Sequence, residues 1–227
     1  RIYRIPGAGL DLERFRPPTQ EERQYWRKQL NIDTDTFFLV SAGELNENKN
    51  HRIVLEALKK LRERSDGQIN IRYGICGDGF FRQRLEEWIK NMKLEDVVTL
   101  YGYCTNMPEI LGGADAAVFP SKREGLGMAG LEALAMGIPV IASDNRGTRE
   151  YMKHGKNGYL CRYDDSESFL KGIEMIRRMN PKQREEMSVC CRASAEPFSK
   201  ANTIRIMREI YASIDQPAEE MELWKKK

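Results

Sequence analysis

The sequence predicts an α/β fold built around a parallel β-sheet. Short apolar runs rich in β-branched and aromatic residues alternate with amphipathic stretches along most of the chain. Such runs are typical of strands buried on both faces, and their alternation with helices indicates right-handed βαβ units. A glycine follows each apolar run, at the end of the strand where parallel sheets bind ligands.

The 227 residues correspond to one or two domains of roughly 150 residues each. Residues 1–35 lack clear periodicity and are interrupted by Gly and Pro, so we expect a short strand and turn and then a polar helix near residues 21–30. Five buried strands are expected to follow, at residues 37–42, 69–76, 97–100, 116–119 and 138–142.

Helices are expected between and after these strands. Apolar residues share one helical face over residues 54–61 and again over residues 81–92, and residues 128–136 are expected to form a buried helix rich in Ala and Leu. After Gly158 the pattern is mostly helical. One helix is expected around residues 169–176 and another over residues 204–214.

Composition excludes several classes of protein. The 37 basic and 34 acidic residues leave a net charge of +3, too mild for a nucleic-acid-binding protein. No apolar run approaches the roughly 18–20 residues of a membrane-spanning helix. The five cysteines and two histidines lack metal-ligand spacing, so we expect reduced thiols and no metal site. The chain begins at Arg1, without Met or a signal peptide, and we expect a fragment of a longer protein.

The glycines at the expected strand ends indicate a ligand site. Any one of them is as consistent with an ordinary turn as with a site, but five such positions on one sheet edge favour a polar, phosphate-bearing ligand. The glycines are Gly43, Gly77 with Gly79, Gly102, Gly125 with Gly127, and Gly147.

Residues 121–132 are the most informative segment. A strand ends at Pro120, a glycine loop follows, and a helix begins near Gly127, where free N–H groups can bind an anion. Glu124 and Glu132 flank that site, about 12 Å apart if the segment were wholly helical. That spacing suits a sugar nucleotide, although an isolated pair would more simply be a helix cap and a solvated glutamate.

These residues resemble glycosyltransferase family 4 (group 1), whose members are retaining enzymes of GT-B architecture with two Rossmann-like domains facing across a cleft. Glu124 and Glu132 resemble the family's Glu-x7-Glu signature. Further matches in family order lie at residues 5–15, 43–49, 77–79, 114–120 and 157–158. The resemblance implies a Rossmann-like three-layer sandwich with a parallel sheet, the donor-binding C-terminal half of a GT-B fold. The resemblance also implies that the acceptor-binding N-terminal domain is missing from this chain.

On this basis we expect three parts: residues 1–35 entering from the missing domain, a nucleotide-sugar-binding domain at 36–200, and a C-terminal helix and tail at 201–227. The expected substrate is a nucleotide diphosphate sugar, UDP- or GDP-linked, with no cofactor and no metal. The expected partners are this donor and the missing domain, and no nucleic acid. The expected location is cytoplasmic, with a peripheral contact at the inner face of the membrane as an open alternative.

The resemblance also implies roles for individual residues. Glu124 would hold hydroxyls of the donor sugar, and Lys49 would approach the diphosphate and stabilise the leaving group, so these two are the expected catalytic residues. Glu132 would bind the ribose. The remaining donor-binding residues comprise the loop after the fourth strand, the glycine of the first strand and two residues near the nucleobase: Gly125, Leu126, Gly127, Met128, Gly43, Gly102 and Tyr103.

One residue departs from the family's pattern. Glu44 stands directly after Gly43, where the family usually has Arg. A carboxylate repels phosphate unless it is turned away, so Lys49 and the helix start would carry more of the diphosphate, with Asn48 or Asn50 assisting.

Other polar residues are less informative. His51 is expected to begin the helix after the first strand as a surface or capping residue. Arg146 and Arg149 follow the fifth strand and are equally consistent with facing the site and with lying on the surface.

The leading interpretation is the donor-binding domain of a retaining glycosyltransferase that acts on a polysaccharide, lipid or other acceptor. The alternatives are a degenerate nucleotide-binding module, which Glu44 suggests, and a GT-B sugar-nucleotide epimerase. Transfer or hydrolysis of a donor once the missing domain is supplied would distinguish an enzyme from a module. An epimerase would leave the donor nucleotide as its product.

Overall fold

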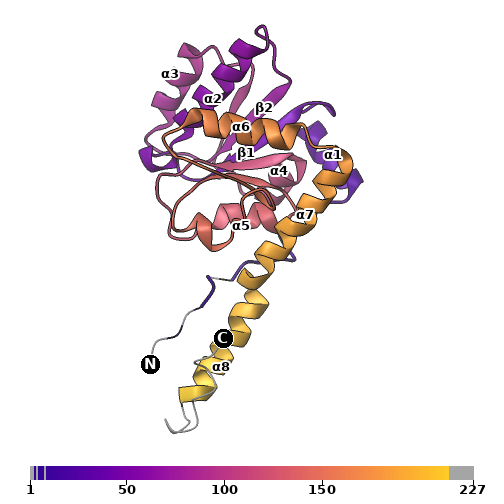
Figure 1. Cartoon of the computed structure of the whole chain (residues 1–227), viewed down its shortest axis with the longest axis vertical. Helices are drawn as coiled ribbons and strands as arrows, with labels where there is room; N and C mark the ends of the chain where they lie inside the picture. Colours follow the sequence, from indigo (N-terminus) through magenta and orange to yellow (C-terminus); the bar gives the residue numbers. More distant parts are fainter. Residues whose placement is uncertain (1–2, 4, 8, 215–227) are drawn as a thin grey trace.

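The computed structural model describes residues 3, 5–7 and 9–214, which form an α/β body from which one helix projects (Figure 1). The polar tail with Trp224, predicted to leave the core, lies outside the described residues. None of the described helices has the length and apolar character needed to cross a bilayer.

A single six-stranded parallel sheet forms the centre of the body, in the order β3-β2-β1-β4-β5-β6. The predicted fold class is therefore confirmed. The strands are β1 (Phe37–Ala42), β2 (Ile71–Cys76), β3 (Val98–Gly102), β4 (Ala116–Phe119), β5 (Val140–Ser143) and β6 (Gly158–Cys161).

The helices alternate with the strands and continue beyond them. The α-helices are α1 (Gln20–Gln29), α2 (His51–Arg64), α3 (Arg82–Asn91), α4 (Met107–Gly113), α5 (Met128–Ala135), α6 (Ser166–Arg177), α7 (Pro181–Ala195) and α8 (Lys200–Ile214). Three short 3-10 helices are η1 (Glu47–Lys49), η2 (Thr148–Glu150) and η3 (Glu196–Phe198).

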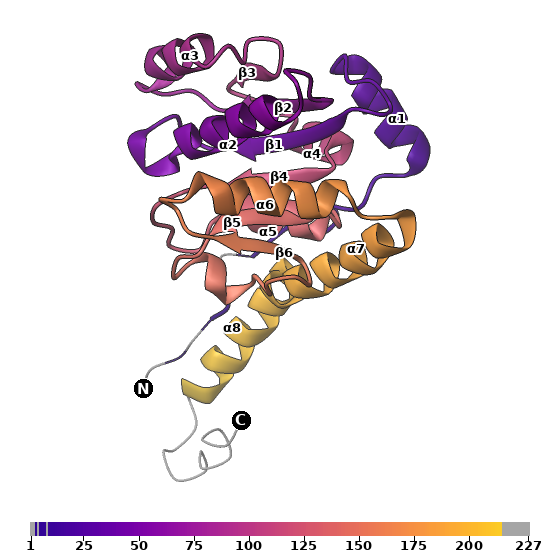
Figure 2. The same ribbon diagram turned by 45° about the horizontal axis from the view of Figure 1, so that its top comes forward.

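Two helical layers cover the sheet, as successive side chains of a strand point to opposite faces (Figure 2). Phe38 and Val40 of β1 belong to a core with α4, α5 and α7, while Phe37 and Leu39 belong to a core with α2, α3 and α6. Helix α1 packs against α4 on the first face, and α2 packs against α6 on the second. The body is thus a three-layer sandwich.

Four expectations about the elements were wrong, the first being the absence of the short helix α4 from the predicted elements. The sheet has a sixth strand, β6, although no strand was predicted after Gly158. Helix α7 was not predicted either, because it is mostly polar and buries little beyond Met187, Cys191 and Ala195. Residues 1–35 contain no strand among their described positions; Leu10 makes only an isolated bridge to Ser199.

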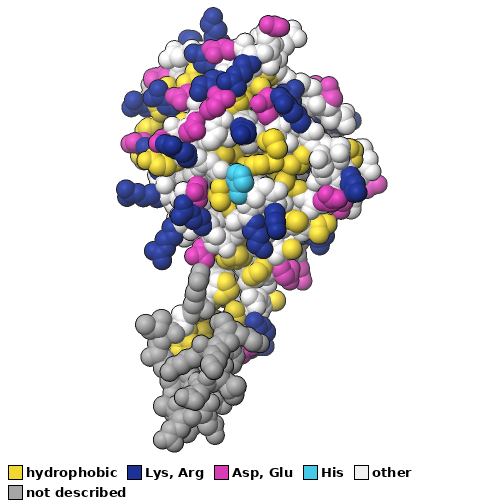
Figure 3. All heavy atoms as spheres, viewed as in Figure 1, with side chains coloured by type: hydrophobic (Ala, Val, Ile, Leu, Met, Phe, Trp, Pro, Cys, Tyr) yellow, Lys and Arg dark blue, Asp and Glu magenta, His cyan; other side chains and the backbone are white. Residues whose placement is uncertain are grey.

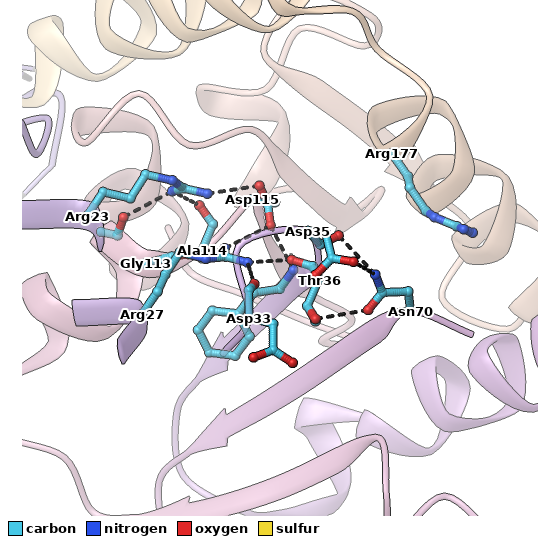
Figure 4. A network of polar contacts seen from close by, with 12 residues as sticks. Arg23, Arg27, Asp33, Asp35, Thr36, Asn70, Gly113, Ala114, Asp115 and Arg177 are labelled. Atoms are coloured by element: carbon cyan, nitrogen blue, oxygen red, sulfur yellow. Dashed lines mark hydrogen bonds and ion pairs between the residues drawn. The ribbon is translucent and has the colours of Figure 1, made fainter. Parts of the chain in front are cut away.

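A polar network at the amino edge of the sheet fixes α1 to the strands (Figure 4). The Asp115 carboxylate, directly before β4, accepts hydrogen bonds from Arg23, from Arg27 and from the backbone N–H of Phe38. The guanidinium of Arg27, only 5% exposed, also donates to the carbonyls of Gly113, Asp33 and Thr36. Arg27 therefore binds the starts of β1 and β4 and the end of α4 to α1.

Helix α8 leaves the body beside the N-terminal segment (Figures 1 and 2). Tyr3 Oη lies 3.0 Å from Ser213 Oγ, which links the two. Ile204, Tyr211 and Ile214 of α8 are exposed, and apolar side chains are visible where the helix leaves the body (Figure 3). On the face shown there, basic and acidic side chains intermingle on the body.

Replacing Arg27 with Met should destabilise the domain by about 3 kcal/mol, since it leaves buried carbonyls and part of the Asp115 carboxylate without a donor. Urea unfolding followed by circular dichroism measures the effect. Arg178→Met is the matched control, because Arg178, the C-cap of α6, is exposed and pairs among the described residues with Glu174 alone, and it should cost less than about 0.5 kcal/mol. Equal losses would contradict the role of the network.

Candidate functional site

Loops rich in glycine meet at the carboxyl edge of the sheet. The backbone N–H of Gly43 donates to the carbonyl of Cys76, and that of Gly77 donates to the carbonyl of Gly102. A Cβ atom on Gly77 would lie 1.9 Å from the carbonyl oxygen of Gly43, and Gly77 has φ of +140°. Glycine is therefore required at Gly77 for the loops to pack this closely.

Two of these loops are joined residue by residue by contacts that we call the loop clasp, defined as the pairs Glu47–Lys122, Asn48–Arg123 and Lys49–Glu124. Lys122 Nζ lies 2.8 Å from Glu47 Oε1, and Lys49 Nζ lies 2.7 Å from Glu124 Oε1. Between them, the Asn48 amide donates to the Arg123 carbonyl and accepts from its N–H. The clasp joins η1 to the loop between β4 and α5.

The two expected catalytic residues are thus in direct contact, as the prediction that they share one site requires. Lys49 and Glu124 are largely buried, with side chains 24% and 17% exposed. Gly43 lies beneath Lys49, since a Cβ atom there would be 3.0 Å from Lys49 Cε. Gly43, Lys49 and Glu124 therefore form one group at the carboxyl edge.

Helix α5 begins next to Glu124. Its N-cap residue, Gly127, has φ of +82°, and no side chain caps the helix, so the first-turn N–H groups can accept an anion. A Cβ atom on Gly127 would lie 3.7 Å from Glu124 Cγ. Because the helix starts at Met128, the segment 124–127 is not helical and the wholly helical 12 Å spacing of the two glutamates does not apply.

Glu132 lies one turn into α5 and is half-buried. Its carboxylate makes no hydrogen bond or ion pair within the described part of the chain. Burial raises its pKa, and the nearby guanidinium of Arg14 lowers it in part. Arg14 was not singled out in the sequence; it follows Asp11 in the loop before α1, and nothing in its spacing relates it to α5.

The residues expected near the nucleobase lie at the end of β3. Gly102 has φ of +70°, and the Arg82 guanidinium lies 3.8 Å from the position that a Cβ atom of Gly102 would take. Tyr103 is 82% exposed, so its ring is available to a ligand. Among the described residues, no hydrogen bond or ion pair joins Gly102 or Tyr103 to the loop clasp, and their role stays a prediction.

Glu124 also lines a hollow of about 770 Å³. Gly125, Leu126 and Arg146 line it, so Arg146 faces the site region. Arg149 instead pairs with Asp144, at 2.6 Å.

Several polar residues of the β1–α2 segment have structural partners. The Asn50 amide donates to the carbonyls of Pro120 and Tyr163, and Asn48 belongs to the loop clasp, so both hold loops together. Glu44 is exposed and accepts a hydrogen bond from Asn46. The expectation for His51 was wrong: it begins α2, but it is only 6% exposed and contacts the hydroxyl of Tyr73.

The fold and the site define a class of protein: a Rossmann-like α/β domain with glycine loops and an uncapped helix start at the carboxyl edge of its sheet. The family model of the glycosyl transferases group 1 matches residues 22–189. Over 213 residues the chain is 35% identical to "Putative glycosyltransferase EpsD" of Bacillus subtilis (strain 168), covering 94% of the chain and 55% of that protein. The chain belongs to the group 1 glycosyl transferases.

Two further comparisons agree with this assignment. The chain is 31% identical over 193 residues to the Escherichia coli UDP-Gal:alpha-D-GlcNAc-diphosphoundecaprenol alpha-1,3-galactosyltransferase, covering 85% of the chain and 49% of that protein. The crystal structure of Anabaena HepE in complex with UDP superposes with a TM-score of 0.82 at 21% identity, covering 90% of the chain and 56% of HepE. The chain spans about half the length of these proteins, and its fold is the C-terminal half of a GT-B fold.

Replacing Glu132 with Gln should raise the melting temperature at pH 7, and the gain should shrink towards pH 4. The raised pKa means that the folded protein holds the proton more tightly than the unfolded chain, so stability falls as the pH rises through that pKa. Scanning calorimetry at both pH values measures the difference. Glu87→Gln, at an exposed position of α3, is the control and should show no such trend. A gain independent of pH would contradict the burial of an unpaired carboxylate.

Proposed function

We propose that this chain is the donor-binding domain of a retaining glycosyltransferase that takes its sugar from a nucleotide diphosphate sugar. The observation that carries the proposal is the contact of Lys49 with Glu124, whose side chain lies beside Gly127 at the uncapped start of α5. A cationic side chain, Lys49, and the free N–H groups at the start of α5 both suit a diphosphate.

The proposed mechanism uses charges that the protein already holds in place. Lys49 exchanges its contact with Glu124 for the diphosphate, and the N–H groups of residues 125–128 share its charge. As the sugar–phosphate bond breaks, these donors stabilise the negative charge on the leaving group. Freed from Lys49, the Glu124 carboxylate accepts hydrogen bonds from hydroxyls of the sugar, while Glu132 accepts them from the ribose.

The donor that we propose first is a UDP-linked sugar, with a GDP-linked sugar as the alternative. Two observations on similar proteins favour UDP: HepE crystallised with UDP and with UDP-glucose, and the galactosyltransferase from Escherichia coli is named for UDP-Gal. The base would lie near Gly102 and the exposed ring of Tyr103. We propose no cofactor, because Lys49 and the helix start supply the positive charge.

A degenerate nucleotide-binding module is the second candidate, and Glu44 is the observation that favours it. Its carboxylate replaces a cation that the family usually provides. Two contacts weigh against this alternative. Asn46 donates a hydrogen bond to the Glu44 carboxylate at 3.1 Å, so that carboxylate already has a partner. Lys49 pairs with Glu124 and with no other carboxylate of the described residues, so Glu44 does not neutralise it.

We further propose that α8 and the N-terminal segment dock against an N-terminal domain outside this chain. Apolar surface is exposed on α8 at Ile204, Tyr211 and Ile214, and on the adjacent N-terminal segment at Ile5. A folded protein rarely leaves such a projecting apolar face without a partner. The acceptor would then bind in the cleft between the two domains.

Nucleotide binding tests the assigned roles of the two glutamates. Glu132→Ala should weaken both UDP and UDP-glucose by about 1–3 kcal/mol, because it removes a charged acceptor of the ribose hydroxyls. Glu124→Ala should leave UDP nearly unchanged and weaken UDP-glucose. Isothermal titration calorimetry gives both affinities. Equal losses for both ligands in both variants would contradict this division.

Glycosyl transfer tests whether two domains are needed. The chain alone should bind UDP yet transfer little sugar, since it lacks the second wall of the cleft, and the full-length protein should transfer sugar from the same donor to the same acceptor. Comparable turnover by the chain alone would overturn the two-domain proposal. UDP binding without transfer by the full-length protein would favour the degenerate module, and release of UDP with an epimerised sugar would favour an epimerase.

A further inference from the structure

A second hollow lies between the first turns of α2 and α3, with a volume of about 370 Å³. Its lining shares no residue with the hollow beside Glu124. Small-molecule sites typically have volumes of about 300–1,000 Å³, so it has room for a compact ligand. None of the residues proposed to bind the donor lines it.

Three cationic side chains line this hollow. Lys122 pairs with Glu47 and Arg52 pairs with Glu56, whereas Arg84 makes no hydrogen bond or ion pair with any described residue. Glu47 is the acidic residue of the lining, and Arg84 contributes to lowering its pKa. The lining therefore carries excess positive charge and suits an anion.

Aromatic rings hold two of these guanidiniums in place. The Cζ atoms of Arg52 and Arg84 lie 5.3 Å and 5.4 Å from the centroid of the Trp88 ring. Phe81 contacts Trp88 edge to face, with centroids 5.7 Å apart, and Arg84 also lies 5.7 Å from the Phe81 ring. Such cation–π contacts restrain long side chains that would otherwise be mobile.

His51 provides a buried polar atom without a partner in the wall of the hollow. The hydroxyl of Ser41 donates to the carbonyl of Val118 and lies 2.7 Å from the hydroxyl of Tyr73, which lies 3.1 Å from His51 Nδ1. The Ser41 proton is used in the bond to Val118, so Tyr73 must donate its own hydroxyl proton to Ser41. The Tyr73 oxygen can then only accept from His51, which requires a proton on Nδ1. His51 Nε2 is then a bare acceptor, and it has no hydrogen-bond partner in the described chain.

Burial keeps this ring neutral. It lowers the pKa of His51 to about 4, with a smaller contribution from the charge of Lys49. A neutral ring with Nδ1–H requires a donor at Nε2, and a buried acceptor left without one costs free energy. A hydroxyl group of a ligand would satisfy it once the lining side chains shift to admit the hydroxyl, since His51 lines the hollow but its Nε2 atom has almost no accessible surface.

From these contacts we propose that the hollow between α2 and α3 binds a sugar phosphate, with its phosphate at Arg84 and Arg52 and a sugar hydroxyl donating to His51 Nε2. The phosphate accounts for the unpaired guanidinium, and the hydroxyl accounts for the unpartnered acceptor. This inference goes beyond the proposed function, because no step of it requires donor binding at Lys49 or Glu132.

Calorimetric titration of the whole chain with glucose 6-phosphate, with and without saturating UDP, tests the proposal. One molecule should bind in both conditions. Methyl phosphate, which has the phosphate without the hydroxyls, should bind at least about tenfold more weakly, as should glucose. Competition with UDP, equal affinities for glucose 6-phosphate and methyl phosphate, or no binding would overturn the proposal.

Two variants locate the site. Arg84→Met, at an exposed position, should weaken glucose 6-phosphate about tenfold or more and leave UDP binding unchanged. Glu132→Ala should weaken UDP and leave glucose 6-phosphate unchanged, so failure of this inference is distinguishable from failure of the proposed donor site. Arg52→Met provides a second test of the phosphate end. Unchanged glucose 6-phosphate binding in both arginine variants would place its site elsewhere and overturn the proposal.

Discussion

The functional edge of the domain depends on the loop clasp between η1 and the β4–α5 loop. Each loop alone is a short irregular segment, and the backbone of such segments is held only where it finds partners. Asn48 supplies two hydrogen bonds to Arg123, and flanking ion pairs place Lys49 against Glu124 and Lys122 against Glu47. Because β1 and β4 are neighbours in the sheet, their following loops emerge side by side. The contacts of the loop clasp then hold the two proposed catalytic residues, Lys49 and Glu124, in fixed positions.

The polar groups at the two edges of the sheet differ in what they contact. At the amino edge, Asp115 and Arg27 pair with each other and bond several backbone groups, which joins α1 to β1 and β4, and only Arg27 Nε of this pair lacks a partner among the described residues. At the carboxyl edge, Glu132 is half-buried and finds no partner among the residues that the structure describes, and α5 starts without a side-chain cap. Unpaired groups of this kind cost stability and persist where a ligand can satisfy them. The half-buried carboxylate and the uncapped helix start therefore belong to the edge where a parallel α/β sheet binds ligands.

The sequence predicted the sheet well, since long-range burial leaves a strong signal in short apolar runs. It failed for β6, a four-residue strand at the sheet edge, and for α4, a helix of seven residues. It also failed for α7, where the spacing of Met187, Cys191 and Ala195 by four residues was the available signal. Glu124, Lys49 and Gly43 could be placed together from strand ends alone. The partners of Asn48, the burial of His51 and the approach of Arg14 to Glu132 could not, because they depend on side chains that meet across loops distant in sequence.

The most direct test of the central claim is a crystal structure of this chain with UDP. The account predicts the diphosphate at Lys49 Nζ and at the N–H groups before and within the first turn of α5, with the ribose hydroxyls on the carboxylate of Glu132. Lys49 should then have moved its contact from Glu124 to the phosphate. A diphosphate bound away from α5, with Lys49 still paired to Glu124 and Glu132 far from the ribose, would contradict it.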